Sequence, residues 1–191
     1  MDINVGYIRY DFNFCGINNF FFNPSNNEDF RDISETDPNS PFYVDPASNS
    51  VLTLTFSSAW LTANSNTVIL PISDILTSVT INVGSGELPY TEGSSTVFTG
   101  GNTAVTITGT FTRFGLTDST WTGAAGLLSV TASSLASIKS FNGAFDGCVA
   151  FTGSGIDQWD VTKVTDMTRM FGACTVFNNQ NLGNWQRSTP G

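Results

Sequence analysis

The stretch VTDMTRMFGACTVFNNQNLGNW, residues 164–185, decides how the C-terminal part of the chain is interpreted, because its apolar pattern occurs twice. A shift of 26 residues (164 − 138) superposes it on the segment that begins at Ile138. The shift aligns eight apolar pairs, four of them identical: Ile138 with Val164, Phe141 with Met167, Ala144 with Met170, Phe145 with Phe171, Cys148 with Cys174, Phe151 with Phe177, Ile156 with Leu182 and Trp159 with Trp185. In repeat proteins of such a period, each unit buries its apolar face only by stacking on its neighbours. We therefore expect these residues to pack as ladders rather than to carry chemistry.

The same segment resembles a known family. LASIKSFNGAFDGCVAF, residues 135–151, is similar to the BspA-type leucine-rich repeat, and residues 156–185 resemble the related bacterial surface-protein repeat. Val130 and Leu135 precede Ile156 and Val161 by the same interval, which suggests a degenerate earlier unit. The resemblance implies a short leucine-rich-repeat-like solenoid of two or three rungs, of a kind found in bacterial surface proteins and in phage or virus particle proteins. It implies no catalytic residues, and it carries over these residues only as stacked core: Trp159, Trp185, Phe145, Phe171, Cys148 and Cys174.

The rest of the chain divides into two further regions. Residues 1–50 are irregular and aromatic, with Phe20, Phe21 and Phe22 in a row, and predict an arm that docks on a neighbouring subunit or covers its own domain. Residues 51–112 alternate Leu and Phe with Thr in VLTLTF, and VTINV and AVTITGTF repeat this pattern, with turn residues in ANSN, GSGE and TGGN. We expect a mainly β protein: an antiparallel sandwich or barrel-like domain over 51–112, followed by the repeat segment over 113–191.

Composition limits the possible partners. The chain of 191 residues has a net charge of −9 with only seven Lys and Arg, so it offers no basic face for nucleic acid or anionic membranes. No apolar run approaches the roughly 20 residues that span a bilayer. MDINVGYIRY has an acid at position two and no apolar run, so no Sec-type leader is predicted.

The cysteines and methionines could be read as chemically active, but we interpret them as structural. The sequence has no His, which excludes His-based zinc sites and triads, and its odd count of three cysteines argues against a disulfide scaffold. Cys148 and Cys174 could form a disulfide between adjacent layers, but a buried pair of free thiols is the simpler state. The register makes Met167 and Met170 core residues rather than copper ligands.

The carboxylates are interpreted in the same way. Asp157, Asp160 and Asp166 could gather a calcium ion, yet they lack the spacing of a dedicated loop, which favours solvated acids at the edge of the units. The paired acids at 28–29 and 35–37 could serve a glycosidase, but nothing in the irregular arm fixes their separation. We therefore predict no catalytic residue, no cofactor and no metal.

Two functions from different classes remain. The first is a structural protein of a virus particle, such as a phage capsid-decorating or tail-associated protein, anchored by its N-terminal part on other virion proteins or on itself. The alternative is a fragment of a bacterial cell-surface adhesin whose repeats bind a host protein or glycan. In either case the last apolar layer, including Phe177, Leu182 and Trp185, is expected to need a cover, either further chain or a partner subunit.

Overall fold

The computed structural model describes residues 49–117, 119–177, 182, 183 and 185. The predicted aromatic arm, Cys15 and the paired acids at 28–29 and 35–37 lie outside these residues. In chain order the elements are β1 (Ser50–Phe56), α1 (Ser58–Ala63), β2 (Thr67–Ile69), β3 (Ile72–Asn82), β4 (Glu87–Tyr90), β5 (Ser95–Val97), β6 (Ala104–Phe114), the 3₁₀ turn η3 (Ala124–Gly126) and β7 (Leu127–Leu135).

Five strands form one open antiparallel sheet in the order β4-β3-β6-β1-β7, and β2 pairs with β5 in a small second sheet. The prediction of a mainly β, antiparallel protein is confirmed. A closed barrel is not found among the described residues, because β4 and β7 are both edges of the large sheet. β7 lies inside the segment assigned to repeats, and it contains Val130 and Leu135.

One face of the sheet is apolar because the strands alternate. On β1, Leu52, Leu54 and Phe56 are buried, while Thr53 and Thr55 on the other face are partly exposed. Phe56 contacts Phe98, which follows β5, with ring centroids 5.4 Å apart, so the small sheet packs on the apolar face. Helix α1 was not predicted; it has six residues, and the Ser57 side chain caps its start by accepting from the Trp60 N–H.

The chain after β7 is fixed to the sheet by buried polar contacts. Ser137 Oγ donates to the Phe111 carbonyl on β6 (2.9 Å) and lies 2.7 Å from Ser50 Oγ on β1. Beyond β6, Gly115 has φ +130° and lies so close to the chain at Asn142 that a Cβ atom would overlap the Asn142 carbonyl. These contacts hold the next segment against the end of β6. Within the described part of the chain, no helix is long and apolar enough to cross a membrane.

Candidate interaction surface

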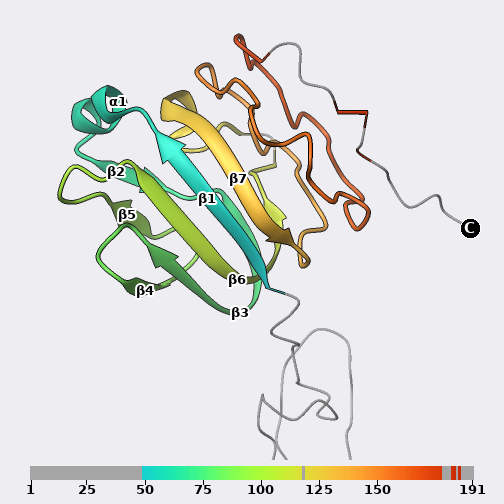
Figure 1. The fold of residues 1–191 in the computed structure, drawn as a ribbon, viewed down its shortest axis with the longest axis horizontal. Coiled ribbons are helices and arrows are strands. Elements are labelled where there is room, and N and C mark those ends of the chain that lie inside the picture. Colours follow the sequence, from blue (N-terminus) through green and yellow to red (C-terminus); the bar gives the residue numbers. More distant parts are fainter. Residues whose placement is uncertain (1–48, 118, 178–181, 184, 186–191) are drawn as a thin grey trace, which may run out of the picture.

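We call residues 138–159 the inner unit and residues 164–185 the outer unit. Their described residues lie side by side next to β7 (Figure 1). Neither unit forms a strand or a helix among its described residues; each is a series of tight turns. Backbone bonds join the two layers, with the Phe141 and Phe145 N–H groups donating to the Asp166 and Met170 carbonyls at 2.8 Å. Isolated parallel bridges pair Ser140 with Asp166, and Ser140 also with Arg113 of β6.

Aromatic side chains stack between the units at the 26-residue offset. The ring centroids are 5.5 Å apart for Phe145 and Phe171, 6.1 Å for Phe151 and Phe177, and 6.4 Å for Trp159 and Trp185. The Trp185 indole N–H donates to the Ile156 carbonyl at 2.7 Å. The residues that the shift superposes in the sequence are therefore neighbours in space.

The stack does not continue in the same form into β7. Val130 lies 26 residues before Ile156, but it is opposite Leu54 in the antiparallel β1–β7 pair. Trp159 also differs from its equivalent Trp185, because the Trp159 indole N–H is buried and has no partner among the described residues. The first layer beneath the units is thus a sheet strand and not a third unit of the same kind.

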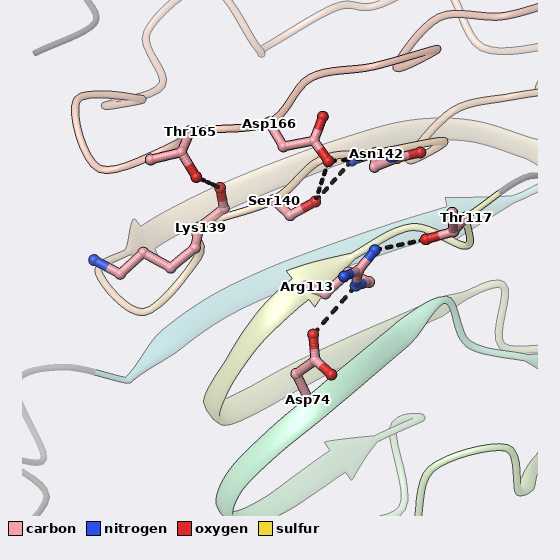
Figure 2. Close-up of polar contacts among 8 residues, drawn as sticks. All are labelled: Asp74, Arg113, Thr117, Lys139, Ser140, Asn142, Thr165 and Asp166. Atoms are coloured by element: carbon pink, nitrogen blue, oxygen red, sulfur yellow. Dashed lines mark hydrogen bonds and ion pairs between the residues drawn. The ribbon is translucent and has the colours of Figure 1, made fainter.

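A polar column follows the edge of the stack (Figure 2). Arg113 pairs with Asp74 at 3.2 Å and donates to Thr117 at 2.6 Å. In the next layers Asn142 donates to the Asp166 carboxylate at 3.0 Å. The Asn142–Asp166 bond joins the inner unit to the outer unit, whereas the Arg113 contacts join β6 to β3 and to the residues just after β6.

A second ion pair was missed by sequence reasoning. Asp146 is buried in the inner unit, and its carboxylate lies 2.6 Å from the guanidinium of Arg169 in the outer unit. The 26-residue shift places Asp146 on Gly172, where a Cβ atom would overlap the Asp146 carboxylate. The sequence therefore showed that the position aligned with Asp146 is a glycine, which leaves room for the Asp146 carboxylate. It did not show that Arg169 is the partner of that carboxylate, because the two residues are not related by the shift.

The two cysteines of the units are free thiols in separate layers. Cys148 is buried, and burial raises its thiol pKa far above the usual range. Cys174 is half-buried and donates to the Phe145 carbonyl at 2.9 Å; burial raises its pKa to about 11. Both thiols are therefore protonated at neutral pH, so neither is an activated nucleophile.

The three aspartates considered for calcium each engage a nearby polar group. The Asp160 carboxylate accepts from the Thr162 hydroxyl (2.6 Å) and backbone N–H (3.0 Å), and these bonds lower its pKa. Asp157 accepts from the Gln158 amide at 2.7 Å. Hydrogen bonds from Thr168, above all, lower the pKa of Asp166. Among the described residues, no three His, Cys, Asp or Glu side chains form a group that could hold a metal ion.

Burial separates the two units sharply. In the inner unit the aligned apolar side chains are all buried, from Phe141 to Trp159. In the outer unit Val164 and Met170 are buried, whereas the following aligned residues are only partly buried: Met167, Phe171, Cys174, Phe177, Leu182 and Trp185. The side of the outer unit that faces away from the inner unit, here called the outer face, is therefore an apolar surface without a described layer on it.

The fold and this surface define a β-rich protein that ends in a stacked repeat. Residues 123–189, about a third of the chain, match the family model described as "Mycoplasma protein of unknown function, DUF285". The match spans β7 and both units. Neither a curated protein nor a solved structure matches the chain.

The family model corrects the resemblance to the BspA-type leucine-rich repeat, because the family that matches these residues is a distinct one. The structure gives a physical reason for the correction. The inner unit is made of turns held by bonds such as Ala144 N–H to the Phe141 carbonyl, with isolated bridges in place of a strand in each layer.

Proposed function

We propose that this is a non-enzymatic structural and interaction protein, in which the sheet domain carries a short solenoid and the outer face is a contact surface for another protein. The observation that carries the proposal is the difference in burial between equivalent residues. Phe145 is buried between rings on several sides, whereas Phe171, its equivalent, is only partly buried. A monomer does not normally leave an aromatic layer of this kind uncovered.

A non-catalytic role is supported by what the polar groups of the units do. The carboxylates of Asp160 and Asp166 hold turns, the Asp146 carboxylate holds Arg169, and the thiols are protonated. Each of these three carboxylates is engaged in a hydrogen bond or an ion pair within the units. Such engagement is typical of a scaffold and not of a site poised for proton transfer.

An apolar dye tests whether the outer face is open. We expect the full chain to bind such a dye, and Met167→Gln, which changes a partly buried residue of the outer layer to a polar one of similar length, to weaken the binding. Leu76→Gln on β3 is the matched control, because Leu76 is 61% exposed and lies outside the units. A monomer by light scattering that binds no dye would contradict the proposal.

Two locations follow from the sequence, and each has its own support. A weakly charged surface rich in Thr, Ser and Asn suits a protein of a virus particle, where the protein would be a capsid-decorating or tail-associated component. The match to a family described from Mycoplasma supports the alternative, a bacterial cell-surface protein whose units bind a host protein or glycan. Mass spectrometry of purified particles and of cell-envelope fractions distinguishes the two locations. A protein of the virus particle must be found in the purified particles.

A further inference from the structure

The hydrogen-bonding pattern between the units indicates what kind of partner the outer face can bind. Four N–H groups of the inner unit, at every second residue, donate to four carbonyls of the outer unit. The bonds are Phe141 to Asp166 (2.8 Å), Gly143 to Thr168 (2.9 Å), Phe145 to Met170 (2.8 Å) and Gly147 to Gly172 (2.8 Å). At these four positions the inner unit presents donors and the outer unit presents acceptors, whereas just before them the bond is reversed, from the Thr165 N–H to the Lys139 carbonyl at 2.8 Å.

The outer unit repeats the donors on its outer face. The equivalent residues, 26 positions later, are Met167, Arg169, Phe171 and Ala173. Their N–H groups have no partner among the described residues. The carbonyls of the first three are occupied within the unit, because they accept from the N–H groups three residues further on, at 3.1, 2.9 and 3.3 Å. Among the described residues, the outer face is thus a row of unpaired donors beside a partly buried aromatic layer.

We infer that the outer face binds a polypeptide that offers a parallel row of backbone carbonyls next to an apolar ladder, which is the chemistry that the outer unit itself offers to the inner unit. This inference rests on the proposed function, that the outer face is a contact surface. It follows from continuity with the interface between the units, where the same donors, the same rings and the same parallel register are already satisfied. Buried N–H groups need acceptors, so a purely apolar partner would leave them unpaired.

A second copy of this chain does not satisfy the surface. In a two-fold pair the same patch meets itself, so donors would face donors. A head-to-tail contact fails for a different reason, because two of the four equivalent carbonyls of the inner unit are already occupied. Ser140 accepts from the Phe114 N–H at 3.0 Å, and Ala144 accepts from the Trp121 indole at 3.0 Å. The acceptor side of the outer unit is bonded to the inner unit. The partner is therefore a polypeptide segment, outside the described units, with a free acceptor edge.

Hydrogen exchange of the backbone amides tests this inference with the full chain. The probe is an additional copy of residues 160–185, inserted between Trp185 and Gln186, which places a copy of Asp166 26 positions after the original. The matched control carries the same 26 residues in scrambled order. The amides of Phe141 and Phe145 are the internal reference, because they are bonded in both chains.

In the unmodified chain we expect the amides of Met167, Arg169, Phe171 and Ala173 to exchange rapidly at low and at high protein concentration. In the extended chain the exchange rates of these four amides should fall, by about tenfold for every ~1.4 kcal/mol of local opening free energy. The scrambled insert should leave these rates unchanged. Protection that rises with the concentration of the unmodified chain would show self-pairing and overturn the exclusion of a second copy. Protection at all concentrations would mean that the surface is covered within the chain, and the proposed function would fail. Rapid exchange in the extended chain would overturn the inferred partner alone.

Discussion

The contrast between the two layers predicts unequal costs for one substitution made at equivalent positions. Phe145→Ala removes a buried ring that lies 4.4 Å from Phe151, 5.5 Å from Phe171 and 5.9 Å from Phe114, measured between ring centroids. Neighbours on several sides hold their places, so the substitution leaves a cavity. Buried Phe-to-Ala changes cost about 3–5 kcal/mol, and we expect ~4 kcal/mol here.

Phe171→Ala removes a ring that contacts Phe145, Phe177 and Trp185 but has no described layer on its outer side. Phe171 stacks on Phe145 and lies 4.2 Å from Phe177, but it is partly exposed. Its loss forfeits only part of the ~1.5–3 kcal/mol that full burial contributes, and solvent fills the space. We expect a loss of ~1.5 kcal/mol in the free energy of unfolding, about 2.5 kcal/mol less than for Phe145→Ala.

Urea unfolding followed by tryptophan fluorescence and by circular dichroism measures both values, provided that the slopes of the two variants match that of the unmodified chain. Phe111→Ala, a buried ring on β6, calibrates the cost of a full cavity in the sheet. Equal losses for Phe145→Ala and Phe171→Ala would refute the reasoning, because they would show that the outer ring is covered as fully as the inner one.

Three further outcomes are expected of the units. Arg169→Ala should lower the free energy of unfolding by about 1–2 kcal/mol, because it leaves the buried Asp146 carboxylate unpaired. Arg169→Lys should restore part of the loss. Thermal unfolding measures both variants, and equal stability of the two would contradict the ion pair. Iodoacetamide at neutral pH should leave Cys148 unmodified until the chain unfolds and should label Cys174 only slowly, as peptide mass spectrometry would detect; rapid labelling of Cys148 would count against its burial. Hydrogen bonds lower the pKa of Asp166 in the folded state below the ordinary 3.8. The ionised carboxylate therefore stabilises the fold above that pH, and this stabilisation is lost as the pH falls through the lowered pKa. Asp166→Asn should accordingly be less stable than the unmodified chain at neutral pH and equally stable in acid. A constant difference between the two chains across this pH range would exclude this role.

Local patterns were enough to predict β1 and parts of β3 and β6, but β7 lies in the segment that was assigned to repeats. The alternation of Leu52 and Leu54 with Thr53 predicted β1, and similar alternation predicted parts of β3 and β6. β-branched residues in alternation report which face is buried, and this property depends only on neighbours in the chain. The order β4-β3-β6-β1-β7 had no such signal, because strand order depends on which distant segments pair.

The surface was predicted in part. The 26-residue shift identified Phe171 and Trp185 as stacking residues, since their chemical type recurs at a constant interval. It did not identify the Asp146–Arg169 pair, whose members are 23 residues apart and follow no repeat. The pair depends on the angle at which one layer lies on the next, and spacing along the chain does not encode that angle.

The sequence by itself determined the period of the units, the residues that form their ladders and the alternation that makes the sheet two-faced. Each of these is a property of residue type and interval, so it can be seen before any contact is known. Only the tertiary structure decided that Val130 belongs to a sheet strand and that the carbonyls of Ser140 and Ala144 in the inner unit are occupied by donors from Phe114 and Trp121. It also decided that four alternate N–H groups of the outer unit have no partner among the described residues. These features depend on which backbone groups find partners across distant segments, and a hydrogen bond is specified by direction and position in space rather than by interval along the chain.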